Sequence, residues 1–509
     1  MIALILFLIF IAVVYLYNTR NFKYWEKKGV KHDKPVVLFG NNIKGYLMQQ
    51  TKSQAAAEMY RKYPNEKVIG YYRSARPELI VKDPELIKKI MVTDFQHFFY
   101  RGFNPNRKAV EPVFHSLFAA EGDLWKMLRT RMTPAFTSAK LKGMFPLIIE
   151  RAEKLQARTL EAAKAGKSLD SRELMARYTT DFIGACAFGL DSDSLNEEDS
   201  NFRKLGKKIF DAGFKDFIIN LLKEMWPEAF KNLKYFAKIE DGARQLAYEV
   251  QKARNFQPSG RNDFLDMMME IKGKGAVEFE SIEKVLPNGD SEKVVMNFTD
   301  DIFMSQLLVF FAAGFETSSN STSMTLHLLA YNPDEQKKVH EDIDKALAKH
   351  NNKLSYDAIR DMPYLEMAFK EAMRILPALG YVSRLCSRDY TFEELGLTID
   401  KEVRVVIPIQ ALHMDPKYWD EPEEFKPERF LPENAEKTKD VYLPFGIGPR
   451  SCIGARLGLM QSLAGLAAIL SKFEVKPAPE SKRHPEIDPL SEIVQGVIGG
   501  LPLIFEERK

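Results

Sequence analysis

The ten residues from 445 to 454 constrain the fold of this chain more than any other segment, because they place one cysteine directly before a helix. Glycines at 446, 448 and 454, together with a proline at 449, predict a fixed turn that ordinary side chains cannot adopt. The backbone N–H groups of the turn, the positive helix terminus and Arg450 would favour the thiolate of Cys452, which is the form that binds metal. We predict a metal ligand at Cys452; the alternative is a buried structural cysteine. A helix after the loop is indicated by leucines on one stripe: Leu459, Leu463, Leu466 and Leu470.

Other common cofactor sites do not fit the chain. The loop approaches the dinucleotide pattern G-x-G-x-x-G, but Ser451 stands at the third glycine position and no acidic residue follows at the expected distance. Zinc and iron–sulfur sites need several ligands at close spacing. The three cysteines, Cys186, Cys386 and Cys452, lie far apart, and the eight histidines form no ligand pair.

The loop matches F-x-x-G-x-R-x-C-x-G and resembles the cysteine loop of the cytochromes P450, in which a cysteine thiolate holds the iron of haem b. The resemblance implies that Cys452 is the iron ligand and that Phe445 and Arg450 lie at the cofactor. It also implies further donors to the haem propionates, because buried carboxylates need charged partners. These are Trp125 and Arg129 in a W-x-x-x-R pattern, Arg384, and Arg450. Core packing of Trp125 and a solvated Arg129 are the alternatives.

A long apolar helix is predicted from Thr299 to Tyr331, opened by capping residues and ended by Asn332 and Pro333. Its centre, residues 313 to 318, resembles the oxygen-activation motif A-G-x-[ED]-T-[TS] of the same family. The resemblance implies that the glycine leaves room for dioxygen, that Thr317 steers protons and that Glu316 links Thr317 to solvent. The alternative is a threonine bonded to the helix backbone and a glutamate in an ion pair.

Two further segments suggest a structural network. Glu371 and Arg374 stand three apart on a predicted helix and can pair. The segment Pro427-Glu428-Arg429-Phe430 resembles the family's P-E-R-F motif, which implies that Arg429 joins that pair. We expect these residues to serve folding and haem retention, not catalysis.

Residues 1 to 17 carry no charge and are just long enough to span a bilayer, which needs about 20 apolar residues. We predict a membrane anchor over 1–18, a hinge over 19–41 and a catalytic domain over 42–509. Aromatic residues 15, 17, 22, 24 and 25 suit an interface belt. A cleaved signal peptide is the alternative, but the segment has no basic start and no small-residue cleavage site. The body is placed on the cytosolic face of the endoplasmic reticulum by basic residues after the anchor: Arg20, Lys23, Lys27 and Lys28.

The rest of the chain predicts one large, mainly α domain with a minor β part. Short β-rich runs at 67–72 and 78–82 predict a small sheet on the N-terminal side, to which 404–408 adds a strand. From about 84 to 376 the pattern is mostly helical, with breaks at Gly166 and at the polar stretch 272–292. The net charge of +3 with interleaved signs gives no basic stripe for nucleic acid, and three cysteines suit a reducing compartment.

The run from 124 to 145 resembles insect microsomal enzymes that oxidise plant toxins and insecticides. The function so implied is a haem-thiolate monooxygenase that hydroxylates or epoxidises an apolar small molecule. Its electrons would come from NADPH-cytochrome P450 reductase, with cytochrome b5 as a candidate second partner. The alternatives are a thiolate-haem isomerase or dehydratase and a non-catalytic haem-binding protein; the sequence does not identify the substrate.

Two residue sets follow from the resemblance. The docking face would include Lys126, Arg131, Lys140, Lys142 and Arg456, with scattered surface charge as the alternative for each. The pocket would be bordered by Phe114, His115, Phe118, Phe310, Phe311, Phe315 and residues 379–382, with ordinary core packing as the alternative for each aromatic.

Overall fold

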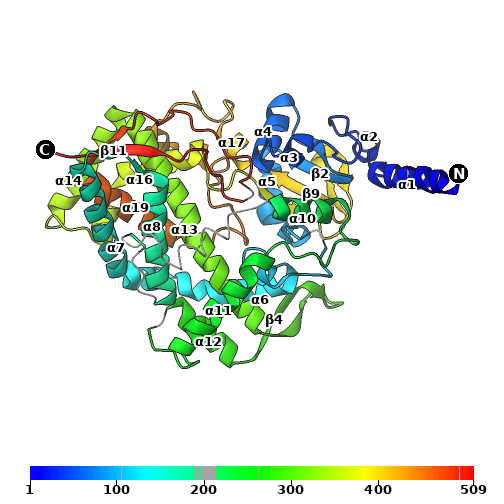
Figure 1. Cartoon of the computed structure of the whole chain (residues 1–509), viewed down its shortest axis with the longest axis horizontal. Helices are drawn as coiled ribbons and strands as arrows, with labels where there is room; N and C mark the ends of the chain where they lie inside the picture. Colours follow the sequence, from blue (N-terminus) through cyan, green and yellow to red (C-terminus); the bar gives the residue numbers. More distant parts are fainter. Residues whose placement is uncertain (105, 190–193, 196–213, 262, 492) are drawn as a thin grey trace.

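Helices make up most of the body, and a small sheet lies toward the end that carries the N-terminus (Figure 1). The computed structural model describes residues 1–104, 106–189, 194–195, 214–261, 263–491 and 493–509. The predicted architecture, mainly α with a minor β part, is confirmed.

The longer helices are α1 (Ile2–Thr19), α4 (Lys52–Lys62), α6 (Gly122–Met132), α7 (Ser138–Lys164), α8 (Ser171–Ile183), α10 (Phe214–Met225), α11 (Ala237–Ala253), α12 (Phe264–Gly273), α13 (Asp300–Tyr331), α14 (Pro333–Lys349), α16 (Pro363–Ile375) and α19 (Ala455–Leu470). The short helices are α2 (Tyr24–Lys27), α3 (Ile43–Tyr46), α5 (Pro84–Lys88), α15 (Tyr356–Arg360), α17 (Ile409–His413) and α18 (Ala435–Thr438).

Helix α13 is the central element and packs against α8, α11, α16 and α19 (Figure 1). Its predicted bounds are confirmed. The Thr299 hydroxyl caps the first turn by accepting the N–H of Ile302 at 3.3 Å. The helix stops at Asn332 because Pro333, which has no N–H, begins α14. Although α13 is apolar and long enough to cross a bilayer, most of its residues are buried in the body, so it is a core helix.

The sheets are small and mostly antiparallel. The largest has the order β1-β2-β9-β6, in which only β2 and β9 run parallel. It contains the three runs predicted as strands. The β part of the described residues also contains a three-stranded sheet, β10-β11-β3, and the hairpins β4-β5 and β7-β8. The bounds are β1 (Val68–Arg73), β2 (Arg76–Val81), β3 (Leu169–Asp170), β4 (Ala276–Val285), β5 (Ser291–Asn297), β6 (Val382–Leu385), β7 (Tyr390–Phe392), β8 (Leu397–Ile399), β9 (Arg404–Ile407), β10 (Phe473–Pro477) and β11 (Pro502–Glu507).

The prediction of a structural break at the polar stretch 272–292 is wrong in part. Strands β4 and β5 form an antiparallel hairpin there. Strand β4 is stabilised from outside. The Asp123 carboxylate on α6 accepts the Ile282 N–H and the Ser281 hydroxyl, both at 2.8 Å. Such charge-assisted bonds hold a hairpin whose strands are largely solvent-exposed.

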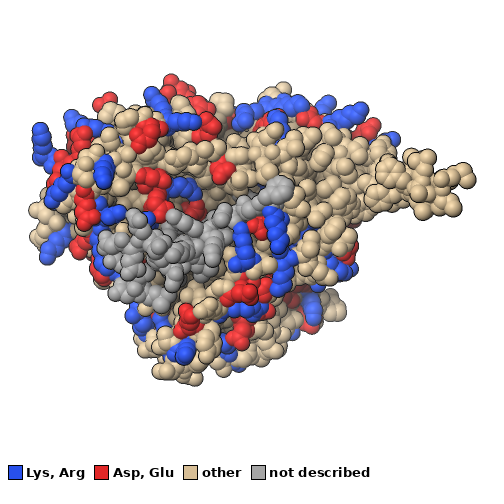
Figure 2. Space-filling view, viewed as in Figure 1, with Lys and Arg blue, Asp and Glu red and all other residues tan. Residues whose placement is uncertain are grey.

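Helix α1 projects from the body and carries no charged side chain, whereas blue and red side chains are interleaved over the body (Figure 2). Its apolar side chains are exposed. The belt prediction is wrong for Trp25, which is 0% exposed and donates its indole N–H to the Tyr71 carbonyl at 3.1 Å. Residues after α1 therefore pack on the sheet; the Lys31 carbonyl also accepts the Gly70 N–H.

Candidate functional site

The cysteine loop is a tight turn that leads into α19. Gly446 and Gly448 have φ angles of 67° and 74°, in the left-handed region that favours glycine. A Cβ at position 448 would lie 1.9 Å from the Met91 carbonyl oxygen, so no side chain fits there. The Cys452 N–H donates to the Phe445 carbonyl at 2.9 Å and closes the turn. The predicted fixed loop before a helix is confirmed.

Cys452 lies deep in the body and is surrounded by protein atoms, but its side chain borders open space and remains accessible. Burial raises the pKa of the thiol, while the Gly454 N–H and the guanidinium groups of Arg129 and Arg101 oppose that rise. The sequence prediction named Arg450 as the charge that favours the thiolate; the charges that act are Arg129 and Arg101. A metal cation deprotonates a coordinating thiol outright, which overcomes the effect of burial.

Four arginines from separate segments gather around this loop: Arg101, Arg129 on α6, Arg384 on β6 and Arg450. Burial and mutual repulsion lower the pKa of Arg384 to about 9, and burial lowers that of Arg101 to about 10. None of the three guanidinium nitrogens of Arg450 has a hydrogen-bond partner among the described residues. Buried charges of one sign without partners are costly, so the cluster is suited to an anionic ligand.

Two other contacts fix the arginine cluster. The Arg450 guanidinium lies over the Trp125 ring, 4.3 Å from its centroid, which explains a tryptophan on this face of α6. Arg129 Nη1 donates to the Ser451 carbonyl at 2.8 Å and ties α6 to the loop. The structure therefore places Cys452, Phe445, Arg450, Trp125, Arg129 and Arg384 close together.

Arg101 was missed by the sequence analysis. It follows the isolated bridge at Tyr100 and lies in no recognisable motif, so no local signal marks it. Its Nη2 donates to the Arg450 carbonyl at 3.3 Å. These residues fit haem b, because an exposed thiol supplies one metal ligand and unpaired guanidinium groups suit two propionates.

The centre of α13 carries the residues that resemble the oxygen-activation motif. Ala313 is exposed although most residues of this helix are buried. The Thr317 hydroxyl donates to the Ala313 carbonyl at 2.8 Å. Glu316 forms an ion pair with Arg172 on α8. Both contacts match the alternative readings of these residues. A Cβ at Gly314 would lie 2.6 Å from Ile183, so this glycine permits close packing of α8 on α13.

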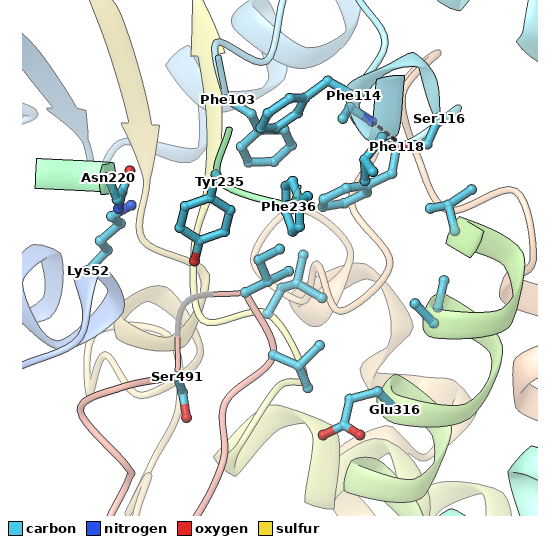
Figure 3. A pocket seen from close by; sticks show the side chains of 18 of the residues that line it. Lys52, Phe103, Phe114, Ser116, Phe118, Asn220, Tyr235, Phe236, Glu316 and Ser491 are labelled. Carbon is cyan, nitrogen blue, oxygen red and sulfur yellow. Dashed lines mark hydrogen bonds between the residues drawn. The ribbon is translucent and has the colours of Figure 1, made fainter. Parts of the chain in front are cut away.

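A cavity of about 480 Å³ adjoins α13 and includes Ala313, Glu316 and Thr317 in its wall. Figure 3 shows phenylalanines from loops before α6 and α11 lining it. The prediction is right for Phe114, Phe118 and Leu379, but not for several α13 aromatics. Phe311 and Phe315 are core residues, 0% and 1% exposed, and Phe310 stacks on Phe136 away from this cavity. Tyr381, within the predicted 379–382, also lies in the wall. Wall residues not predicted include Phe103 and Phe236, and His115 borders a different hollow.

The predicted structural network is present. Arg374 binds both oxygens of Glu371 at 2.7 and 2.8 Å, and both side chains are 0% exposed. Arg429 Nε donates to the same carboxylate at 3.2 Å. Arg374 also donates to the carbonyls of His413 and Pro422, so it joins α16 to the segment that precedes the cysteine loop.

Comparison with known proteins leads to the same family as the geometry of the site. A sequence profile described as Cytochrome P450 matches residues 31–497, so the chain belongs to the cytochrome P450 family. It is 34% identical over 503 residues to cytochrome P450 6B2 of Helicoverpa armigera, covering 98% of this chain and 97% of that protein. It is 34% identical to cytochrome P450 6k1 of Blattella germanica, covering 99% and 96%, and 35% identical to cytochrome P450 6a2 of Drosophila melanogaster, covering 97% of both. The protein is a haem-thiolate monooxygenase that acts on small molecules with electrons from a redox partner.

Proposed function

We propose that this enzyme oxidises apolar foreign molecules, among them plant toxins and insecticides, with Cys452 as the iron ligand and Thr317 and Glu316 as the proton-transfer residues. The observation that carries this proposal is the exposed Cys452 thiol beside four arginines, of which Arg384 and Arg450 are buried and Arg450 has no hydrogen-bond partner for its guanidinium among the described residues. Bound haem supplies dioxygen activation, which no side chain can perform. Phe445, Trp125, Arg129, Arg384 and Arg450 would hold the cofactor.

The chain's own residues would manage water and protons. The Thr317 hydroxyl points its proton at the Ala313 carbonyl, so its oxygen lone pairs can accept a hydrogen bond from water in the cavity. Glu316 lines the same cavity and is held by Arg172, whose Nη1 also donates to Asn320 at 2.9 Å. Proton delivery through Glu316 therefore requires its carboxylate to exchange Arg172 for water.

The test is product formation by the holoenzyme with NADPH and NADPH-cytochrome P450 reductase, using furanocoumarins, flavonoids and insecticides as substrates. Oxygenated products that need both NADPH and reductase support the proposal. Rearrangement of a peroxide without NADPH would indicate the isomerase or dehydratase, and binding without any product would indicate a haem-binding protein. In Cys452→Ala the thiolate-type ferrous-CO spectrum should disappear; its retention would remove Cys452 as the ligand.

We also propose that residues 1–18 anchor the enzyme in the endoplasmic reticulum membrane, that 19–41 form the connection and that 42–509 form the cytosolic catalytic domain. The apolar, exposed α1 and the basic residues that follow it support this topology. Reductase, and cytochrome b5 in a second role, would dock near the cysteine loop. There the Arg456 guanidinium on α19 donates to the Ser138 hydroxyl on α7 at 3.0 Å, so the basic residues at the starts of these helices lie close together. The docking set is Lys126, Arg131, Lys140, Lys142 and Arg456.

A further inference from the structure

Two neighbouring helices reach the centre of α13 with polar side chains. Helix α8 runs alongside α13 (Figure 1), and the Thr179 hydroxyl on α8 lies 3.0 Å from the Phe315 carbonyl. On α19, the side-chain amide of Gln461 donates to the Gly314 carbonyl at 3.1 Å and to the Ser318 hydroxyl at 2.6 Å. Gln461 therefore holds α13 at the glycine of the segment that resembles the oxygen-activation motif.

This contact lies next to the residue proposed to deliver protons. The Thr317 hydroxyl donates to the Ala313 carbonyl, one residue before the carbonyl that Gln461 holds. In a helix the Gly314 carbonyl also accepts the N–H of residue 318, and a second donor fixes the direction in which that carbonyl points. Because the direction of a carbonyl and the path of the helix are coupled, Gln461 fixes the turn of α13 that carries Thr317.

Gln461 belongs to the helix that follows the cysteine loop. It stands nine residues after Cys452 and six residues after Ala455, the first residue of α19, which corresponds to about 9 Å along a helix. The Tyr178 hydroxyl on α8 donates to the backbone carbonyl of Gln461 at 2.9 Å. Helices α8, α13 and α19 thus meet at this residue, and a short length of helix connects it to the predicted iron ligand.

A glutamine at this position is unfavourable for the core. Its side chain is 1% exposed, and its Oε1 has no hydrogen-bond partner among the described residues. A buried polar atom without a partner costs about 1–3 kcal/mol, which an apolar side chain of the same length would avoid. Packing alone therefore does not explain Gln461, whereas a need to fix α13 relative to the cysteine loop does.

We propose that Gln461 is a positioning residue for dioxygen activation, which sets the position of Thr317 relative to the Cys452 loop. The inference rests on the proposed function and deepens it, because Gln461 acts through Thr317 and, unlike Thr317, does not line the cavity. Without the Gln461 amide, the turn of α13 at Gly314 loses its contact with α19, and the Thr317 hydroxyl is no longer held at one place in the cavity wall.

The first measurement is the product formed per NADPH by the holoenzyme with reductase, using the furanocoumarin, flavonoid or insecticide that the unmodified enzyme oxidises fastest. In Gln461→Met the side chain keeps its length but donates no hydrogen bond. We expect coupling to fall several-fold, while haem content, the thiolate-type ferrous-CO spectrum and substrate affinity are retained. Gln461→Glu should restore most of the coupling, because burial raises the pKa of a carboxyl and a protonated carboxyl still donates to the Gly314 carbonyl. Gln461→Asn, whose amide is one carbon shorter, carries the test if the methionine variant does not fold.

Gln336→Met is the matched control. Gln336 on α14 is also a buried glutamine that holds α13, since it donates to the Leu329 carbonyl at 3.1 Å, but it does so near the end of α13 and far along the helix from Thr317. This variant should lower the free energy of unfolding, as Gln461→Met does, yet leave coupling unchanged. The double variant of Gln461→Met with Thr317→Ala should couple no worse than Thr317→Ala alone, because a residue that acts through Thr317 adds nothing once the hydroxyl is gone.

A second measurement needs no turnover. Hydrogen exchange in the haem-loaded enzyme, followed by mass spectrometry of peptides that contain residues 313–318, should be several-fold faster in Gln461→Met and unchanged in Gln336→Met. Equal exchange in Gln461→Met and the unmodified enzyme, or an equal loss of coupling in Gln336→Met, would overturn the inference. Loss of coupling in Thr317→Ala but not in Gln461→Met defeats this inference alone, whereas the absence of NADPH-dependent product in the unmodified enzyme defeats the proposed function.

Discussion

Arg450 is a buried cation whose guanidinium nitrogens find no partner among the described residues, although Glu121 attracts its charge from nearby. A lone buried charge destabilises a fold unless something compensates it. We attribute its presence to a carboxylate of the cofactor. The stacking on Trp125 then holds the guanidinium in place for that contact.

Arg450→Gln should therefore release haem faster. A hydrogen bond to a charged group contributes about 1.5–3 kcal/mol, so we expect release to accelerate by about tenfold or more. Transfer of haem to an excess of apomyoglobin measures the rate. Arg131→Gln changes an exposed arginine of α6 that lies outside the arginine cluster, so it should leave the rate of haem release unchanged. Equal rates in both variants would contradict the assignment.

Thr317 is suited to a role in proton delivery because its hydroxyl lies in the cavity wall. Thr317→Ala should keep haem and substrate affinity but lower the product formed per NADPH by several-fold, with the balance appearing as peroxide. Thr317→Ser should restore most of the coupling. Thr322→Ala is the control, because Thr322 makes a similar bond to the Ser318 carbonyl at 2.7 Å inside the core. Unchanged coupling in Thr317→Ala would reject the role.

At this scale the sequence predicts residues that recur at fixed spacing. Cys452, Arg450 and Phe445 lie within one loop, and Trp125 and Arg129 stand four apart on a helix, so their match to the family's motifs predicts them as cofactor residues. Arg101 reaches the same cluster from an irregular segment, and its partners are fixed only by the tertiary fold. Residue contacts such as Glu316 with Arg172 are equally invisible, since 144 positions separate the two.

The hairpin of β4 and β5 shows what is lost at the scale of elements. Residues 277–280 alternate apolar and acidic side chains, and Asn288 and Gly289 form the turn, so a strand period was present. The high charge of the stretch hid it, because strands usually show a buried face and this hairpin is held mainly by Asp123. Long helices such as α13 were predictable since both of their ends carry local signals.

The network of Glu371, Arg374 and Arg429 stabilises the junction between α16 and the segment before the cysteine loop. Glu371→Gln removes the charge that compensates two guanidinium groups, and breaking a buried pair costs about 3–5 kcal/mol. We expect a loss of unfolding free energy toward the lower end of that range, with the remaining folded enzyme still active per haem. Denaturant titration measures it. Glu366→Gln on the same helix, where the pair with Lys370 is partly exposed, should cost under about 1 kcal/mol; similar losses would disprove the assignment.

His413 at the end of α17 makes this junction sensitive to pH. Burial and the nearby Arg374 charge lower its pKa from 6.5 to about 3, and its Nε2 accepts the Leu443 N–H at 2.8 Å. Below pH 6.5 the His413 ring takes up a proton in the unfolded chain but stays neutral in the folded protein. The contribution of His413 to the free energy of unfolding is therefore constant above pH 6.5 and falls below it, by at most about 1.4 kcal/mol per pH unit. His413→Gln should make the fall between pH 6.5 and 5 shallower by about 1 kcal/mol per unit.

Unfolding midpoints measured across that pH range give the slope, which a uniform loss of stability does not alter. Tyr442, whose ring stacks on His413, does not titrate in this window of pH. The exposed His484 provides the control, since His484→Gln should keep the slope of the unmodified protein. An unchanged slope in His413→Gln would show that the ring is not held neutral.

At the scale of the whole molecule, we expect α1 and the body to interact with the bilayer in different ways. Helix α1 exposes its apolar side chains all around, as a spanning helix does. A second apolar set on the body follows it at the same end of the molecule (Figure 1): Val36, Val37, Ile43 and Leu47, which are 46%, 38%, 38% and 56% exposed. Removal of residues 1–19 should therefore convert integral attachment into reversible binding and leave haem content unchanged, because α1 has few contacts with the body.

Washing of membranes with alkaline carbonate distinguishes these states, because it removes reversibly bound proteins but not spanning ones. The full-length enzyme should stay with the membrane and the truncated enzyme should be released. In flotation with neutral vesicles, the truncated enzyme should still bind, and Ile43→Ser with Leu47→Ser should weaken that binding, since each buried apolar side chain contributes about 1.5–3 kcal/mol. Val295→Ser on β5, which removes a side chain of a residue 66% exposed on a separate hairpin, should not. Full release of the truncated enzyme from the vesicles would limit membrane contact to α1, and retention of that enzyme through the carbonate wash would place a second insertion point in the body.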